Sequence, residues 1–360
     1  MRSVRIWLFL LLAFCLVYPV CGWVNAVTAA EVKAKTASAP PATPEEVGGR
    51  GEGYRPEEEE GKKETKKEEA QEEECPSTFG PIITDTAIPI EKGMFAVQPT
   101  FGLGFVTNSF TRSWRRVSAG GNFQSFGMDW KFTYGLFNNL EVFVVVPYVH
   151  NWAGQVNEPG PNGERAASFG GLSDINLTFK YRLVEEGPRM PTVTALFATD
   201  FPTGHYRRLN PSILGIDEIG GGAYVFTTGL NLSKYIKPFI FYANFWYSMQ
   251  TAFSNMGEDD NGSSVYFRNY PRDFVTVNLA AEYPIVGKWV ALLELTSFWD
   301  GGRLFGHQSN VAPAALVSVL PGIEYMATEK FSLALGVNID LFGKNGDATV
   351  TPLLSMVYAF

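Results

Sequence analysis

Histidine and cysteine are scarce in this sequence of 360 residues, which contains three of each. The histidines stand far apart in the chain, at His150, His205 and His307. No serine lies in a Gly-x-Ser-x-Gly turn, and the acidic residues at 258–260 lack the spacing of a calcium loop. Because a hydrolase needs a nucleophile, a base and an orienting group within hydrogen-bond reach, the sequence predicts no enzyme. It likewise predicts no metal site and no cofactor.

Long apolar runs are also missing beyond the N-terminus, where no stretch reaches eighteen residues. A membrane-spanning helix needs about 20 apolar residues, so the sequence argues against a helical membrane protein. Charged residues make up only 18% of the chain, whereas it contains 28 Phe, 15 Tyr and 8 Trp. The fold must therefore place many large apolar side chains without a spanning helix.

The first 30 residues have the pattern of a secretory signal peptide. Two arginines precede an apolar stretch that Pro19 interrupts, and small residues suitable for cleavage follow by residue 30. An uncleaved membrane anchor is the alternative, but the apolar stretch is several residues too short for a span. Two of the three cysteines would leave with the signal, so the mature chain would keep Cys75 alone and form no internal disulfide.

Residues 31–78 form an acidic segment that is rich in Ala, Pro, Glu and Lys and has Tyr54 as its only aromatic residue. Such a segment cannot bury enough apolar surface to fold alone, so the sequence predicts a disordered linker in the periplasm. Glu and Lys at helical spacing favour partial helix, but no apolar seam indicates a coiled coil.

From Met94 onward the sequence alternates between apolar and polar residues. The stretch LSDINLTFKYRL at 172–183 is the clearest case, with one apolar row and one row that carries charge. Successive side chains of a β-strand point to opposite faces, so such alternation predicts strands. The twelve predicted strands are 94–107, 123–134, 140–152, 172–183, 192–201, 223–233, 238–249, 273–283, 289–298, 314–325, 331–342 and 348–360.

The connections between these strands alternate between short turns and mostly longer loops. A meandering transmembrane barrel has short periplasmic turns and long extracellular loops, whereas a soluble sandwich has no reason for this asymmetry. In such a barrel the apolar row faces lipid, because each Lys or Arg near the membrane midplane would cost roughly 2 to 4 kcal/mol. A soluble barrel with the aromatic row inside is the alternative, but twelve strands would enclose an unusually large interior to fill. The sequence therefore predicts an all-β, up-and-down, antiparallel transmembrane barrel over residues 93–360.

Three motifs carry a family resemblance: GGLSDINLTFKYRL from Gly170, ATDFPTGHY from Ala198 and DLFGKNGD from Asp340. On these motifs, residues 85–360 resemble the outer-membrane barrels of the phenol-degradation meta-pathway (MetA-pathway) transporter family. The ending LLSMVYAF is similar to the last strand of many bacterial outer-membrane barrels. The resemblance implies a Gram-negative outer membrane and recognition by the barrel-assembly machinery through the strand that ends at Phe360. The partners implied are outer-membrane lipid, lipopolysaccharide and a small-molecule substrate, and no nucleic acid.

The strand pattern also predicts what faces the lumen. The predicted polar site residues are Asp129, Lys131, Asp174, Lys180, Arg182, Glu294 and Asp340. Counting every inward charge, eight acids face three bases, which indicates either a wet pathway that mildly favours cations or a salt-bridged interior that passes little. The predicted apolar path consists of Phe143, Tyr242, Trp246, Leu292 and Phe298.

The apolar luminal residues have two compatible interpretations. They could line a route for small hydrophobic or aromatic molecules, since ligand sites are mostly apolar with few polar groups. They could instead pack against a plug, for which residues 79–92 are the candidate segment. The sequence therefore predicts a channel or passive transporter for small compounds. The competing hypothesis is a structural or adhesive barrel with a closed lumen, whose loops and tail bind partners.

Overall fold

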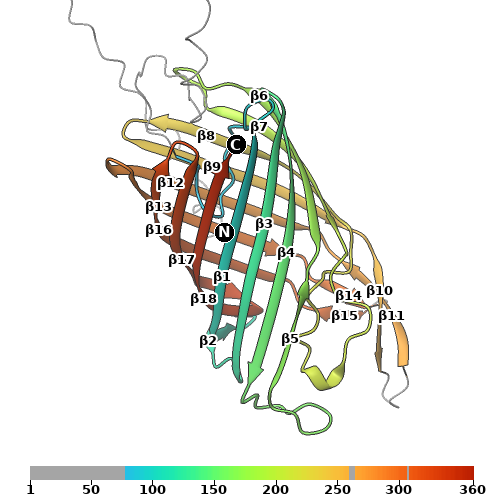
Figure 1. The fold of residues 1–360 in the computed structure, drawn as a ribbon. Helices are drawn as coiled ribbons and strands as arrows, with labels where there is room; N and C mark the ends of the chain where they lie inside the picture. The colour runs from blue at the N-terminus through green and yellow to red at the C-terminus, as the bar shows by residue number, and fades with distance from the viewer. Residues whose placement is uncertain (1–77, 259–263, 306–307) are drawn as a thin grey trace, which may run out of the picture.

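Twelve long antiparallel strands close into a barrel in the computed structural model, which describes residues 78–258, 264–305 and 308–360 (Figure 1). The predicted signal peptide and almost all of the predicted linker lie outside the described residues. The barrel strands are β1 (Phe95–Phe110), β3 (Asn122–Phe137), β4 (Leu140–Gly154), β6 (Ile175–Val184), β7 (Thr192–Phe201), β8 (Val225–Ile236), β9 (Phe239–Gln250), β12 (Phe274–Val286), β13 (Trp289–Asp300), β16 (Ala314–Thr328), β17 (Phe331–Lys344) and β18 (Gly346–Ala359). Two short strands, β2 (Arg116–Val117) and β5 (Ala167–Leu172), extend the sheet beside β1 and β4.

The first and last barrel strands pair with each other and complete the ring. β1 and β18 are antiparallel from Ala96 opposite Ala359 to Phe110 opposite Gly346. Every other barrel strand pairs with the barrel strands before and after it in the chain, which is an up-and-down meander. A closed ring leaves no unpaired backbone edge, as a lipid environment requires. Each of the twelve predicted strands coincides with one of these strands, which confirms the predicted all-β barrel.

The structure corrects the sequence-based description at two long connections. Residues 251–271 and 300–311 read as loops, yet they hold β10 (Phe253–Glu258), β11 (Ser264–Pro271), β14 (Arg303–Phe305) and β15 (Gln308–Val311). These strands form a second, four-stranded sheet that extends from the end of the barrel with the long connections, which we call the loop end (Figure 1). The opposite end, with the short connections, is the turn end. They escaped the pattern because their apolar and polar residues do not separate into clean rows.

The strand predicted at 172–183 is also divided in the structure. β5 ends at Leu172 and β6 begins at Ile175, with Ser173 and Asp174 between them. The rest of the described chain contains one short helical segment, the 3-10 turn η2 (Pro211–Ile213), and no helix long and apolar enough to cross a membrane.

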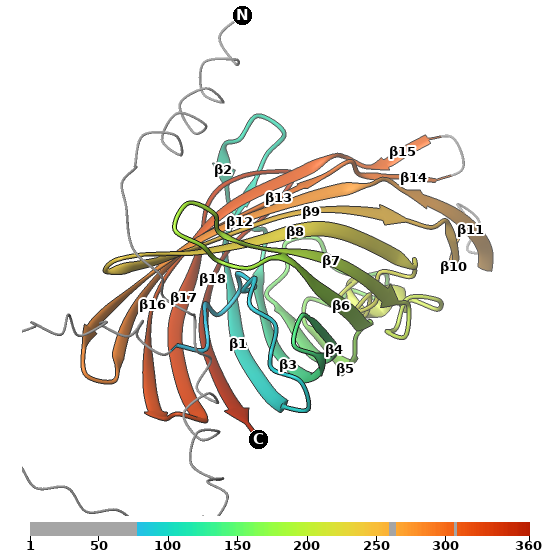
Figure 2. The ribbon, with the colours of Figure 1, turned by 90° about the horizontal axis from the view of Figure 1, so that it is seen from above.

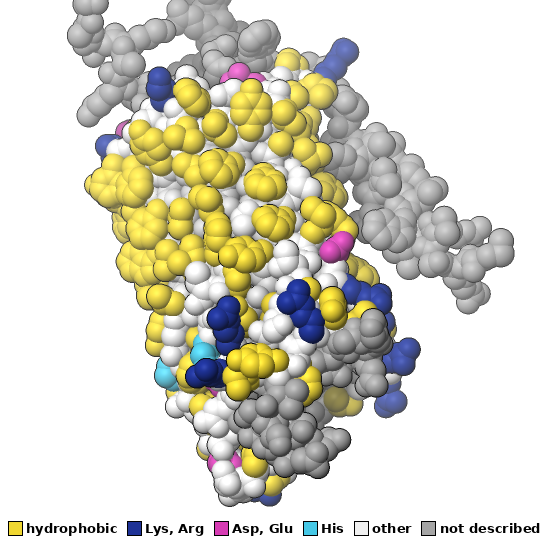
Figure 3. Space-filling model, turned by 90° about the vertical axis from the view of Figure 1, so that its right-hand side faces the viewer, with side chains coloured by type: hydrophobic (Ala, Val, Ile, Leu, Met, Phe, Trp, Pro, Cys, Tyr) yellow, Lys and Arg dark blue, Asp and Glu magenta, His cyan; other side chains and the backbone are white. Residues whose placement is uncertain are grey.

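The two rows of each barrel strand face opposite environments. On β6, Phe179 and Leu183 are 40% and 55% exposed on the outside, whereas Lys180 between them is 1% exposed on the inside. Figure 3 shows the outward side chains of one face of the barrel as a broad apolar area. A continuous apolar surface of this size is not stable in water and fits the hydrocarbon of a membrane. The apolar row of each barrel strand therefore faces lipid.

Candidate functional site

Residues 78–92, which we call the luminal segment, lie inside the ring of strands (Figure 2). The segment reaches the barrel wall through a tight turn in which the N–H of Gly93 donates to the carbonyl of Gly135 at 2.8 Å. Gly93 has a φ of 81°, which favours glycine. A Cβ on Gly135 would collide with the backbone of Glu91, so only glycine lets the segment pass this close to β3.

Carboxylates of the barrel wall hold the backbone of the luminal segment. Glu294 on β13 is fully buried and accepts hydrogen bonds from the N–H groups of Ile82 and Thr84, at 2.7 and 2.6 Å. Glu141 on β4 accepts the N–H of Ile90 at 2.7 Å. The segment has no regular secondary structure, so the wall supplies the hydrogen bonds that its buried backbone needs.

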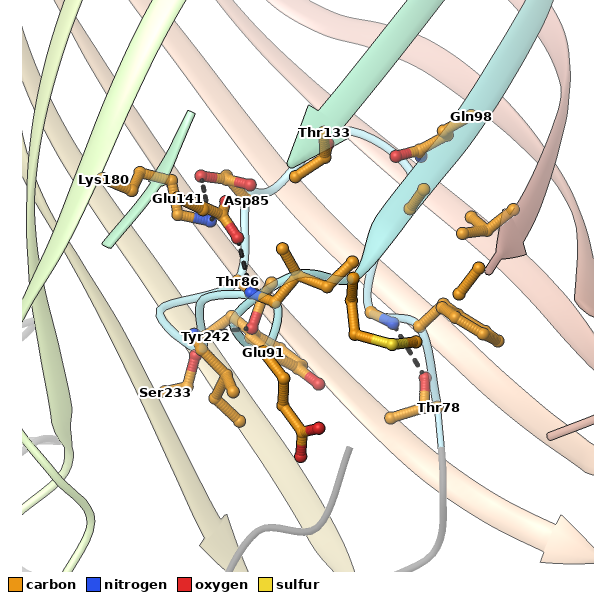
Figure 4. Close-up of a pocket in the computed structure, with 18 of the residues that line it drawn as sticks. Thr78, Asp85, Thr86, Glu91, Gln98, Thr133, Glu141, Lys180, Ser233 and Tyr242 are labelled. Atoms are coloured by element: carbon orange, nitrogen blue, oxygen red, sulfur yellow. Dashed lines mark hydrogen bonds and ion pairs between the residues drawn. The ribbon is translucent and has the colours of Figure 1, made fainter. Parts of the chain in front are cut away.

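Asp85 forms the centre of the contact between the luminal segment and the wall (Figure 4). Its carboxylate lies 3.0 Å from the Nζ of Lys180 and 3.4 Å from the Nζ of Lys131. Asn231 donates to the same carboxylate at 2.7 Å, and Asn244 accepts from the Asp85 N–H at 2.9 Å. Lys180 is 1% exposed and also pairs with Glu141 at 2.9 Å, so the segment supplies half of the charge that compensates this buried lysine.

The charges around Asp85 set the pH at which its contacts fail. Burial raises the pKa of the Asp85 carboxyl, but the charges of Lys180 and Lys131 outweigh burial and hold that pKa below its ordinary value. A group with a depressed pKa contributes its stabilisation above the ordinary pKa and loses it as the pH falls through the depressed pKa. We therefore expect the contribution of Asp85 to closure to be complete at neutral pH and lost only below about pH 4.

Bilayer conductance of the intact chain and of Asp85→Asn, recorded as the pH is lowered stepwise, checks this expectation. The two proteins should differ by a constant factor between pH 7 and pH 5 and should converge below about pH 4. Convergence already at pH 6 would contradict the depressed pKa.

The apolar residues predicted to line the lumen all have inward positions, but they meet different neighbours. Tyr242 is 5% exposed, and its hydroxyl donates to Glu282 at 2.9 Å. Trp246 is half-buried and donates from Nε1 to Asn231 at 2.8 Å. Leu292 is 4% exposed and packs in a cluster that includes Ile82 of the luminal segment.

The other two apolar residues lie on different parts of the wall. Lys131 lies over the ring of Phe143 at 4.2 Å from the centroid, so Phe143 borders the ion-pair cluster. Phe298 is half-buried near the loop end and contacts Phe274 at 5.3 Å between centroids. The five residues are thus distributed around the lumen and do not form one continuous apolar stripe.

The remaining polar site residues have separate roles. Asp129 lies on the inward row of β3 and is exposed. Asp340 is 5% exposed, with Ser318 at 2.6 Å and the N–H of Thr349 at 2.8 Å. Arg182 lies at the turn end, where it contacts Glu185 and the carbonyl of Asn138, so it belongs to the rim and not to the interior.

Asp174 holds the long β7–β8 connection over the loop end of the barrel. Its two carboxylate oxygens accept the N–H groups of Gly204 at 2.8 Å and Gly221 at 2.7 Å. A Cβ on Gly204 or Gly220 would strike the other glycine's backbone, so the close packing of this loop needs glycine. Asp174 therefore orders a cover at the loop end and does not line the path.

A cavity of about 200 Å³ remains between the luminal segment and the wall. Its lining combines apolar side chains such as Ile88, Ile240 and Tyr242 with charged ones such as Lys234 and Glu186. Because it borders residues of the β6–β7 and β8–β9 turn region, it opens toward the turn end. In the residues that the structure describes, no group of three His, Cys, Asp or Glu side chains could hold a metal ion.

Sequence reasoning missed Asp85, Asn231 and Asn244, which together hold the centre of the luminal segment. One signal was present, because Asp85 is the only charged residue between Phe79 and Ile90. A lone charge in an apolar segment predicted to enter the lumen needs an opposite charge there, and the inward row already contained two lysines. The asparagines gave no signal, since any polar residue fits an inward position.

Comparison with known proteins supports the fold. The COG4313 outer membrane channel from Pseudomonas putida F1 is similar at a TM-score of 0.63 and 15% identity, over 79% of this chain and 100% of that chain. The NanC porin gives a TM-score of 0.42 at 10% identity, over 73% of this chain and 98% of that chain. The translocator domain of autotransporter NalP from Neisseria meningitidis gives 0.44 at 12%, over 75% and 90%.

The first of these similarities shows the barrel fold and no more, because the identity is low. The other two TM-scores lie below 0.5, so those proteins add nothing further about this chain. No protein-family model matches the sequence, and no curated protein matches it.

Proposed function

We propose that this chain is an outer-membrane channel for small hydrophobic or aromatic compounds and that the luminal segment closes it. In this proposal the short turns face the periplasm and the long loops face outward, as the strand connections indicate. The resemblance of the three sequence motifs to the meta-pathway transporter family supports the same substrate class.

The way in which the lumen is filled carries this proposal. A barrel that is permanently shut fills its interior with side chains of its own wall, as eight-stranded barrels do. Here fully buried wall residues such as Glu294 and Lys180 bind the luminal segment, which is not part of any barrel strand. Hydrogen bonds, ion pairs and packing hold that segment in the lumen. A wall that is matched to a removable segment suits a gate better than a structural core.

The substrate class follows from the balance of side chains in the lumen. Trp246 and Phe143 present aromatic surface next to polar groups, which is the usual composition of a site for small organic ligands. A pathway for inorganic ions alone would not need these rings.

The structural hypothesis, in which the barrel only displays loops, is favoured by the ordered cover that Asp174 holds at the loop end.

Solute uptake by proteoliposomes tests the proposal. We expect Trp246→Ala and Phe143→Ala, made in the chain without residues 79–90, to lower the uptake of an aromatic tracer relative to a sugar of similar size. An aromatic contact is worth about 0.5 to 1.5 kcal/mol, which corresponds to about a two- to tenfold change in this ratio.

Two lipid-facing substitutions serve as controls for this experiment. Phe132 and Leu335 are 37% and 49% exposed on the outer face. Phe132→Ala and Leu335→Ala should lower the folded yield without a change in the uptake ratio. Equal changes in the ratio for inner and outer substitutions would refute the proposed path, and no uptake by any variant would favour the structural hypothesis.

A further inference from the structure

Most arginines after residue 78 lie at the loop end of the barrel, whereas most lysines lie at the turn end or, like Lys131 and Lys180, inside the lumen. Of eleven arginines, only Arg182 and Arg189 belong to the turn end, and the other nine belong to the loop end. Of eight lysines, only Lys344 belongs to the loop end. A guanidinium group binds phosphate through two parallel hydrogen bonds, whereas an ammonium group acts as a point charge. The loop end is thus the end with phosphate-binding chemistry.

One face of the small sheet at the loop end combines two of these arginines with tyrosines. Arg208 forms a β-bridge with Met256 of β10, and Met256 is opposite Tyr266 of β11. Bridge partners and every second residue along a strand share a face, so Arg208, Tyr266 and Arg268 point the same way. Tyr266 is 71% exposed, and Tyr270 on the same row is 44% exposed. We call these four residues the arginine–tyrosine face.

The opposite face of this sheet is already occupied. Phe253, Asn255 and Asn269 are 6%, 7% and 0% exposed. The ring of Phe253 meets Tyr206 of the β7–β8 connection edge-on at 5.8 Å between centroids. The sheet therefore packs on the loop that covers the barrel mouth, and the arginine–tyrosine face is the free side.

The arginine–tyrosine face lies just beyond the apolar band. β11 leads within two residues into β12, whose outward row runs from Val275 to Tyr283, with both end residues exposed. Eight residues of antiparallel strand span about 27 Å along the strand, which at the usual tilt of about 40° covers roughly 20 Å of height, most of the ~25 Å height of an outer-membrane apolar band. Figure 3 shows basic side chains gathered next to the edge of this band. The face is therefore at the level of lipid head groups.

Resting on the proposed placement in the outer membrane, we propose that the arginine–tyrosine face binds a phosphate group of the lipid A part of lipopolysaccharide. Among the described residues, neither Arg208 nor Arg268 forms an ion pair with a carboxylate, and both are exposed. Arg268 has one long contact, 3.4 Å from Nη1 to Ser254. Two available guanidinium groups match the charge of a phosphate, and tyrosine rings suit the boundary between head groups and hydrocarbon.

Binding of purified lipopolysaccharide to the full-length chain in detergent micelles tests this proposal. We expect the double variant Arg208→Gln/Arg268→Gln to bind lipopolysaccharide more weakly. Each guanidinium removed should lower the affinity at least about tenfold, which is equivalent to ~1.4 kcal/mol. Arg208→Lys with Arg268→Lys should restore only part of the affinity, because lysine keeps the charge but loses the paired geometry. Lipid A without its phosphates should bind the unmodified chain as weakly as intact lipopolysaccharide binds the glutamine variant.

Arg189→Gln provides the matched control, because Arg189 is an exposed arginine at the opposite end of the barrel. Its affinity for lipopolysaccharide should equal that of the unmodified chain, and circular dichroism should confirm that every variant is folded. Equal affinity of the glutamine variant and the Arg189→Gln control would overturn the proposal, as would equal binding of lipid A with and without phosphate. A chain that binds the phosphorylated lipid but never conducts would refute the channel and leave this site intact.

Discussion

Removal of residues 79–90 should convert a closed barrel into an open channel. Without the segment, Glu294, Glu141 and Lys180 lose their luminal partners and meet water instead. The barrel itself should persist, since β1 and β18 close the ring through their own pairing. Planar-bilayer recording should show discrete open steps for the deletion variant and silence or rare brief openings for the intact chain.

The open lumen of this deletion variant should prefer cations. The inward charges that lose a partner in the deleted residues include Glu141, Glu294 and Glu324, against Lys131 and Lys180, and rings of acidic side chains favour cations. The reversal potential in a salt gradient measures this preference. A chain that lacks residues 31–77 but keeps the luminal segment is the control and should remain closed. Silence from both deletion variants would favour the structural barrel.

Asp85→Leu should release the luminal segment while it leaves the barrel wall unchanged. The substitution removes the carboxylate between Lys180 and Lys131 and leaves Asn231 without its acceptor. Removing one partner of a buried ion pair costs about 3 to 5 kcal/mol. This cost corresponds to an increase of about a hundredfold or more in the ratio of open to closed channels. Lys180 keeps Glu141 at 2.9 Å, so the wall itself retains a paired charge.

Open probability in bilayers and protease cleavage within residues 78–92 measure the release by two independent routes. When opening and closing are fast relative to cleavage, the cleavage rate follows the population of the open state. Thr86→Ala is the matched control, because Thr86 is next to Asp85 and its hydroxyl accepts from the N–H of Ile88 within the same segment. Equal behaviour of the two variants would show that Asp85 does not hold the segment.

The strands were predictable because a barrel in lipid imposes two strict conditions on every strand. An inward residue may be charged and an outward residue may not, so pairs such as Phe179 and Lys180 fix the register. The alternation of turn and loop lengths supplied the topology. By contrast, β10 and β11 lie beyond the hydrocarbon band, where Arg268 and Tyr270 can share one face without penalty. The sequence pattern weakens wherever neither face of a strand meets hydrocarbon.

The luminal site was only partly predictable, since a strand pattern assigns a residue to a face and not to a partner. Lys180 and Glu294 were assigned to the interior, but the sequence did not indicate that both would contact one short segment. Asp174 and Asp340 had the same pattern, yet Asp174 holds two loop glycines and Asp340 contacts the two neighbouring strands. These roles differ in which groups lie within contact distance of each side chain, and the strand pattern does not give those distances.

The turn at Gly93 has a kinetic consequence for the proposed gate. Fewer than ten residues, including this turn, connect Asp85 to the start of β1. A segment that leaves the lumen therefore remains tethered close to the groups that bind it. A short tether gives an effective concentration in the millimolar range, which no dilution of the protein can lower. Closure should therefore be unimolecular and repeatable, and the channel should flicker between states rather than remain open after one escape.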